Sequence, residues 1–175
     1  ASDVYKRQDV VKLLVDIVSK NGNLLLSVPL RADGTFDEKE EKILNEFGNW
    51  MNINKEAIYQ TRPWKIFGEG PIADKDVQLN AQGFNEWAYS KADAKEIRFT
   101  QTDKNLYATV LGWPEDGKIL IRSLAEGNGL YPTKIGRVEL LGYGKVSFTR
   151  TDKGLVVDIP AKSLKNIAPV LKIRK

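Results

Sequence analysis

The first hydrophobic pattern in the chain has the period of a helix. From Asp9 onward, apolar residues three and four positions apart form a single stripe on a helical wheel: Val11, Leu14, Val15 and Val18. Val10, Leu13 and Ile17 widen this stripe, so the predicted helix is expected to be heavily buried. Asn21-Gly22 follows, and these residue types are typical of the position just after a helix.

The next apolar run, residues 24–28, has the length of a strand. Only Ser27 interrupts it, and a short run that is apolar on both faces is typical of a parallel strand covered by helices. A helix could also carry these leucines, but Pro29 and Asp33-Gly34 limit the run to strand length. The pattern therefore favours a buried parallel strand.

A second helix is predicted to begin near Asp37. Thr35 and Glu38 have the spacing of a capping box, and several acidic residues in the first turns suit the helix dipole. Apolar residues at helical spacing form the inner stripe of this helix: Ile43, Phe47 and Trp50. The predicted order is thus helix, strand, helix.

The rest of the chain has the pattern of short strands. Periodicity is lost between Phe67 and Lys95, which predicts a connecting segment. Beyond it, seven short apolar runs recur about every ten residues: 97–102, 106–112, 118–124, 137–142, 145–150, 155–160 and 169–175. This spacing, with polar turns between several runs, predicts an antiparallel β-sandwich. Residues 1–8 carry no pattern and are left unassigned.

Composition excludes several kinds of chemistry. The 175 residues contain no cysteine and no histidine, so thiolate nucleophiles, Ser-His-Asp arrangements and sites with Cys or His metal ligands cannot be built. The net charge of +4 comes from 27 basic and 23 acidic residues spread along the chain, and it argues against a nucleic-acid partner. No apolar stretch approaches the roughly 20 residues that span a membrane, so no membrane partner is expected.

Several motifs together resemble one family of enzymes. KNGNLLLSVPLRADGT (20–35), NKEAIYQTRPW (54–64) and GEGP (68–71) are similar to the end of the catalytic domain of α-L-fucosidases of glycoside hydrolase family 29. LYATVLGWP (106–114) and VLKI (170–173) resemble the C-terminal sandwich domain of that family. Many relatives have NVGP where this chain has SVPL, which indicates a subgroup of the family.

The resemblance implies a mixed α and β fold with a particular domain order. Residues 9–67 are expected to be the helix-strand-helix remnant of a (β/α)8-like barrel, which in complete form needs about 250 residues. Residues 68–95 are expected to connect this remnant to a C-terminal β-sandwich at 96–175. Without the other barrel strands, residues 9–64 are expected to fold poorly on their own.

The resemblance also implies a function, which this chain is expected to carry only in part. The family is similar to retaining glycosidases, with an aspartate nucleophile and a carboxylic acid/base, and these residues lie upstream of the matched segment. We therefore assign no catalytic residue here and expect the chain alone to be inactive. Fucosylated glycans are the expected partners of the full-length enzyme, its expected location is periplasmic or secreted, and no metal or organic cofactor is implied.

Three residues are the candidates for contact with substrate. Ser27, Val28 and Arg31 fall at the C-terminal end of the predicted strand, which is the active-site side of any such barrel. The alternative for Arg31 is a solvated loop position. Three acidic residues near the expected barrel mouth are given structural roles: a turn for Asp33, a local hydrogen bond for Glu56 and a loop position for Glu69.

The alternative function is a carbohydrate-binding sandwich without catalysis. Aromatic faces stack on sugar rings, and Trp87 and Trp113 are the residues that this hypothesis can use. Arg62 and Trp64 also have the pattern of a sugar platform, but packing of Trp64 between the last helix and the sandwich is favoured.

Overall fold

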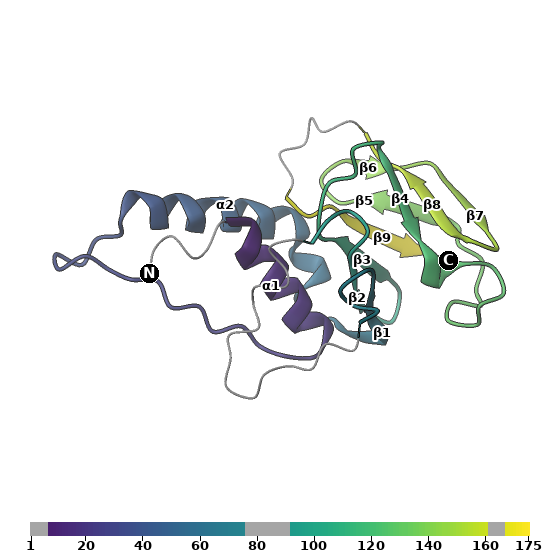
Figure 1. Ribbon diagram of the computed structural model, residues 1–175, viewed down its shortest axis with the longest axis horizontal. Coiled ribbons are helices and arrows are strands. Elements are labelled where there is room, and N and C mark those ends of the chain that lie inside the picture. Colours follow the sequence, from purple (N-terminus) through teal and green to yellow (C-terminus); the bar gives the residue numbers. More distant parts are fainter. Residues whose placement is uncertain (1–6, 76–91, 161–166) are drawn as a thin grey trace.

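The computed structural model describes residues 7–75, 92–160 and 167–175 of the chain. Its helical segments are α1 (Arg7–Ser19), α2 (Glu38–Asn54) and the short 3-10 helices η1 (Lys55–Ala57) and η3 (Arg122–Leu124). Nine strands follow in chain order: β1 (Arg62–Glu69), β2 (Ile97–Gln101), β3 (Leu106–Val110), β4 (Lys118–Ile121), β5 (Arg137–Leu140), β6 (Gly144–Lys145), β7 (Phe148–Thr151), β8 (Gly154–Asp158) and β9 (Val170–Arg174). Figure 1 shows the two long helices at one end of the molecule and the strands at the other.

Within the described residues the strands form two antiparallel sheets. The larger sheet has the order β1-β2-β3-β9-β5-β6, and the smaller has the order β4-β8-β7. Inward-facing residues of both sheets share one apolar cluster, in which Ile97 and Phe99 of β2 meet Ile121 of β4 and Val157 of β8. The predicted antiparallel sandwich content of the C-terminal half is therefore present.

The outer face of the larger sheet is covered by the helices. Side chains alternate along a strand, so Tyr107 and Val170 point away from the sandwich interior. They pack in a second apolar cluster with Val11 and Val15 of α1 and with Trp50 of α2. The sheet is thus buried on both faces, and both predicted helices are found close to their expected positions.

The start of α2 differs in detail from the predicted capping box. The Asp37 side chain accepts a hydrogen bond from the Lys39 backbone N–H at 2.9 Å and is the N-cap. Thr35 instead donates to the Asp33 carboxylate through its backbone N–H and its hydroxyl. The helix N-terminus was therefore predicted correctly, while the residue that caps it was not.

The predicted parallel strand at 24–28 is wrong for this structure. Residues 22–29 form no helix or strand, and Leu25 is 93% exposed. The nearest pairing is one isolated antiparallel bridge between Leu30 and Phe36. The physical reason is that a strand needs neighbours for its backbone N–H and C=O groups, and the described strands pair only among themselves. The helix-strand-helix unit is here a helix, an irregular segment and a helix.

The larger sheet also begins earlier than expected. Residues that were divided between the barrel remnant and the connecting segment form β1, which pairs with β2 from Arg62 opposite Gln101 to Glu69 opposite Ile97. The register shifts between Pro63 and Gly68, and proline is tolerated because β1 is an edge strand. A Cβ at Gly68 would lie 2.5 Å from the Ile97 carbonyl oxygen, so glycine permits this close approach. Proline and glycine hid the strand pattern in the sequence.

Candidate functional site

The three predicted substrate contacts lie in the irregular segment between α1 and α2. Ser27 and Arg31 are exposed and Val28 is half-buried. Arg31 donates to Asp37 at 3.4 Å, and the turn that follows is closed by a hydrogen bond from the Gly34 N–H to the Arg31 carbonyl at 2.9 Å. Neither of the two cavities described below is lined by these three residues. Their role in substrate contact therefore stays a prediction.

Asp33 has the turn-forming role expected for it. Its carboxylate accepts hydrogen bonds from the hydroxyl and the backbone N–H of Thr35 at 2.7 and 3.0 Å. These donors lower the pKa of Asp33, with the hydroxyl as the largest cause. A carboxyl group held ionised in this way is unsuited to donate a proton.

Glu56 forms long-range contacts where a local hydrogen bond was expected. Its carboxylate accepts from the Tyr107 hydroxyl at 2.9 Å and from the Lys172 ammonium at 2.5 Å. Burial, reinforced by the Glu56 carboxylate, raises the pKa of Tyr107 to about 12. The group thus joins η1 to strands β3 and β9.

Glu69 is a buried structural carboxylate and not a loop residue. It ends β1 and accepts hydrogen bonds from the backbone N–H groups of Arg122 and Ser123, both at 2.7 Å, and from the Ser123 hydroxyl. These donors are the first N–H groups of η3, which have no partner inside that short helix. Glu69 therefore caps η3 and links the two sheets.

A buried ionic cluster that the sequence did not reveal joins α1 to the larger sheet. Arg98 of β2 donates to Asp16 of α1 at 2.5 Å and to Glu96 at 2.6 Å, and all three side chains are at most 5% exposed. Glu96 also accepts from the backbone N–H groups of Ile72 and Ala73. Burial alone would lower the pKa of Arg98, but the charges and hydrogen bonds of the two carboxylates outweigh it and raise that pKa.

The described carboxyl groups with shifted pKa values are all shifted downward. They are Asp33, Asp37, Asp74 and Glu139. In each case the largest cause is a hydrogen bond donated to the carboxylate, such as the one from Arg122 to Asp74 at 2.6 Å. Retaining hydrolysis needs a proton donor with a raised pKa about 5–5.5 Å from a nucleophilic carboxylate. The shifts found here favour structural roles for these four groups.

The tryptophan residues mostly serve packing. Trp64 is 8% exposed and meets Phe99 edge to face at 5.0 Å, which confirms that it packs against the sandwich. Trp50 is buried and donates from its ring nitrogen to the Ala168 carbonyl at 2.9 Å. Trp113 is half-buried, and Trp87 lies outside the described residues.

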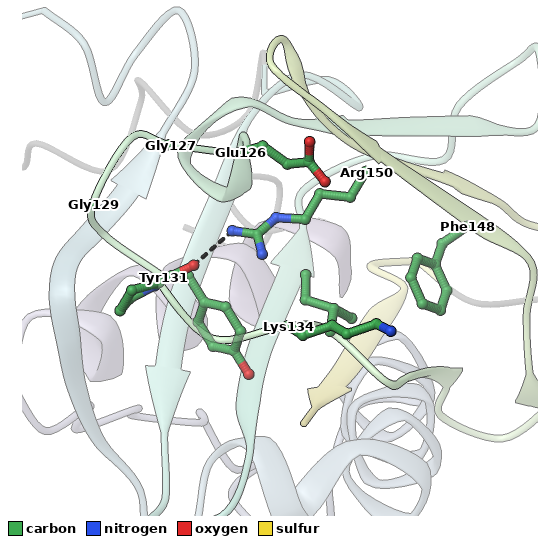
Figure 2. Close-up of a pocket in the computed structure, with 9 residues that line it drawn as sticks. Glu126, Gly127, Gly129, Tyr131, Lys134, Phe148 and Arg150 are labelled. Carbon is green, nitrogen blue, oxygen red and sulfur yellow. Dashed lines mark hydrogen bonds between the residues drawn. The ribbon is translucent and has the colours of Figure 1, made fainter.

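Among the cavities in the described part of the chain, two open on the sandwich. The first, of about 830 Å³, lies beside Trp113 and includes Asp74, Lys118 and Arg122 in its lining. The second, of about 650 Å³, lies under the segment between η3 and β5 and is shown in Figure 2. No group of three or more acidic residues in the described parts of the chain is arranged to hold a metal ion.

Comparisons with known proteins agree with the motifs. A family model described as α-L-fucosidase matches residues 1–56, and a model of the α-L-fucosidase C-terminal domain matches residues 91–174. The plasma α-L-fucosidase of Rattus norvegicus is 31% identical over 164 residues, which cover 93% of this chain and 30% of that protein. The tissue α-L-fucosidase of Homo sapiens is 31% identical over 159 residues, with 91% and 28% covered.

Solved structures extend the likeness to the fold. The Thermotoga maritima α-fucosidase in complex with a mechanism-based inhibitor superposes with a TM-score of 0.70 at 28% identity, covering 98% of this chain and 34% of that one. The same enzyme in complex with fucose has a TM-score of 0.68 at 29% identity, covering 96% and 34%.

The fold and the motifs define a class, the glycoside hydrolases, to which these relatives belong. Within that class the chain belongs to the α-L-fucosidase family, as a C-terminal part that includes the family's C-terminal domain. It spans about 30% of the length of the curated relatives that it matches.

Proposed function

We propose that this chain is part of an exo-acting α-L-fucosidase that hydrolyses terminal α-linked L-fucose from glycans. The observation that carries the proposal is the match over 98% of the chain to the Thermotoga maritima α-fucosidase. Two family models support it as well. The α-L-fucosidase model matches the N-terminal part of this chain, and the model of the C-terminal domain matches the C-terminal part. Fucosylated glycans are the proposed partners of the whole enzyme.

The proposed reaction proceeds with retention of configuration. One carboxylate attacks the anomeric carbon while a carboxylic acid protonates the leaving oxygen, and water then hydrolyses the glycosyl-enzyme. We assign neither carboxyl group to this chain, because the buried carboxylates Asp16, Glu69 and Glu96 are engaged by Arg98 or by backbone N–H groups. The chain by itself is therefore expected to be inactive.

The proposed contribution of this chain is to complete and support the catalytic domain. We assign residues 9–61 to the end of the barrel and residues 62–175, which begin with β1 of the larger sheet, to the connection and the sandwich. Ser27, Val28 and Arg31 would then lie at the end of a barrel strand that forms when other barrel strands supply its missing backbone partners. The exposure of Leu25 in the irregular segment supports this assignment, because an apolar run of this kind is normally covered.

We also propose that the enzyme is exported, to the periplasm or the medium, as the family resemblance implies. No helix within the described residues has the length and apolar character to cross a bilayer. A fractionation of the producing cells, followed by detection of this chain with an antibody, tests the location directly.

Release of 4-nitrophenol from 4-nitrophenyl α-L-fucopyranoside tests the proposed function. The purified chain is expected to release none above the buffer rate, with the Thermotoga maritima α-fucosidase as the active control. The polypeptide that also includes the sequence encoded upstream of Asp9 is expected to release it. In that polypeptide, Arg31→Ala is expected to raise KM about tenfold, because one charged hydrogen bond to the substrate would be lost.

Each result has a definite meaning. Turnover by the chain alone that survives repurification would overturn its proposed inactivity. A folded, extended polypeptide that releases no fucose would overturn the proposed function. An unchanged KM and kcat in the Arg31→Ala variant would remove Arg31 from the substrate contacts.

A further inference from the structure

The cavity in Figure 2 is lined by residues of the sandwich and by none of Ser27, Val28 and Arg31. It is open to solvent and is lined by residues of the segment 126–135, which follows η3, and by Phe148 and Arg150 of β7. In Figure 1 this part of the chain lies at the end opposite the N-terminus of α2. A ligand bound here would be separate from one bound at the predicted substrate contacts.

Arg150 holds the wall of this cavity in a defined shape. Its guanidinium donates to the carbonyl oxygens of Leu124, Tyr131 and Thr133 at 2.7, 2.6 and 2.9 Å, and to that of Ala125 at 3.4 Å. The same group lies 5.8 Å from the centre of the Tyr131 ring. Because four carbonyl groups along one segment share a single guanidinium, the cavity is preformed and binding requires little ordering.

The Asn128 side chain also forms hydrogen bonds within this segment. The Asn128 side chain donates to the Ser123 carbonyl at 2.6 Å and accepts from the Leu130 backbone N–H at 2.9 Å. Gly127 and Gly129 both have φ near +78°, a backbone conformation that favours glycine. A Cβ at either glycine would meet no atom within 4 Å, so the backbone conformation, and not a close approach, is what favours glycine here.

The lining combines aromatic faces with free polar groups. The rings of Tyr131 and Phe148 are half-buried and lie at two sides of the cavity, with Lys134 between them (Figure 2). In the described part of the chain, the Glu126 carboxylate, the Lys134 ammonium and the Tyr131 hydroxyl form no hydrogen bond or ion pair. The cavity, of about 650 Å³, thus combines apolar walls with a few polar groups, as sites for small ligands do.

The other cavity differs in how its charges are used. Arg122 pairs there with Asp74 at 2.6 Å, and Lys118 pairs with Asp158 at 2.5 Å. The Glu69 carboxylate in its lining caps η3. The charges of these groups are engaged in contacts within the fold, whereas the side chains of Glu126 and Lys134 form no such contact in the described part of the chain.

We propose that the cavity around Tyr131, Phe148, Glu126 and Lys134 binds one sugar ring of a neutral glycan. A sugar ring presents C–H groups to an aromatic face, and each hydroxyl both donates and accepts hydrogen bonds. It can therefore donate to Glu126 and accept from Lys134 without a net charge of its own. That the glycan is the one the enzyme acts on rests on the proposed function, while binding itself does not.

Titration of the full 175-residue chain tests this site. Backbone amide signals are followed by NMR as 2′-fucosyllactose, lactose, L-fucose or, as an anion control, sodium phosphate is added. The expected result is saturable shifts of residues 126–135 and 148–150 with 2′-fucosyllactose at millimolar concentration. Equal shifts with lactose would assign recognition to the unfucosylated part of the glycan and also support the site.

Matched variants locate the binding. Tyr131→Ala is expected to weaken binding about tenfold, because one aromatic contact and its buried area are lost. Tyr143→Ala is the control and is expected to leave binding unchanged, because Tyr143 is 56% exposed and lies outside the cavity. Glu126→Gln and Lys134→Ala, at exposed positions, serve if Tyr131→Ala disturbs the segment, and each is expected to weaken binding severalfold.

Three outcomes would overturn the site: no saturable shift with any sugar, shifts centred on Trp113, or a response to phosphate alone. The outcome of the sugar titration and the outcome of the fucoside assay do not depend on each other. A chain that binds sugar while its extended form releases no fucose keeps the site and loses the proposed function. If the extended enzyme releases fucose but the sandwich binds no sugar, the proposed function stands and the proposed site is overturned.

Discussion

At the scale of single residues, the charge cluster of Asp16, Arg98 and Glu96 is the most consequential arrangement in the chain. Arg98 is 1% exposed, and its guanidinium forms ion pairs with both carboxylates. Removing one partner from a buried pair leaves an uncompensated charge, and this costs far more than the pair contributes relative to apolar residues. Exposed pairs behave differently because water screens them.

Asp16→Asn tests this difference against an exposed control. The substitution is expected to lower the free energy of unfolding by roughly 3–5 kcal/mol, since Arg98 stays buried with one partner fewer. Asp158→Asn removes a carboxylate that is 51% exposed and paired with Lys118, and is expected to cost less than about 1 kcal/mol. Urea denaturation of both variants measures the difference. Equal losses would show that Arg98 gains compensation elsewhere when Asp16 is neutral.

At the scale of elements, α1 and the segment that follows it have opposite environments. Val11 and Val15 are buried against the larger sheet, and Asp16 is tied to Arg98. Residues 22–29 form neither helix nor strand and include Leu25, which is 93% exposed. In this chain α1 and η1 pack on the larger sheet, while the expectation that residues 9–64 fold poorly on their own stays a prediction.

Amide hydrogen exchange followed by mass spectrometry measures this contrast. Peptides from α1 are expected to exchange about as slowly as those from β3, because opening α1 exposes the same apolar cluster. Peptides from 22–29 are expected to exchange within the first time point, since this backbone belongs to no ladder or helix. Rapid exchange of α1 together with 22–29 would instead indicate one poorly folded unit.

At the scale of the whole molecule, the segment between α1 and α2 exposes three large apolar side chains. Leu25, Leu30 and Phe36 are 93%, 58% and 42% exposed, and Leu30 pairs with Phe36 through one bridge. Large apolar side chains that are exposed in one chain are often covered by other protein segments. In the proposed enzyme these segments are barrel strands.

Replacing Leu25 and Leu30 together by Asn is expected to reduce this surface without affecting the fold. Binding of a hydrophobic fluorescent dye is expected to fall severalfold, and Tm is expected to change by less than about 2 °C, because exposed substitutions have little effect on stability. Leu120→Asn is the control, since Leu120 is 47% exposed on β4. Unchanged dye binding in the double variant would place the apolar surface elsewhere.

Periodicity along the chain was sufficient for elements whose signal is local. Both long helices, most strands from β2 to β9 and the antiparallel arrangement follow from spacing that any short window contains. The predicted run 145–150 is an exception, because Lys145 belongs to β6 of the larger sheet and Phe148 begins β7 of the smaller one. The turn at Asp33 and the burial of Trp64 were also predicted, because Asp-Gly is typical of turns and a large aromatic ring is typically buried. The family motifs added the class of enzyme.

What only the tertiary structure decided are the contacts between distant segments. Arg98 meets Asp16 from 82 residues away, and Glu69 caps a helix that begins 53 residues later. Strand β1 was hidden by Pro63 and Gly68, and the predicted strand at 24–28 has no neighbour to pair with. The cavity beside Tyr131 exists because one arginine of β7 gathers carbonyl groups from 17–26 residues earlier. A pattern of polar and apolar positions specifies what each segment buries, but the partner it is buried against depends on how the whole chain folds.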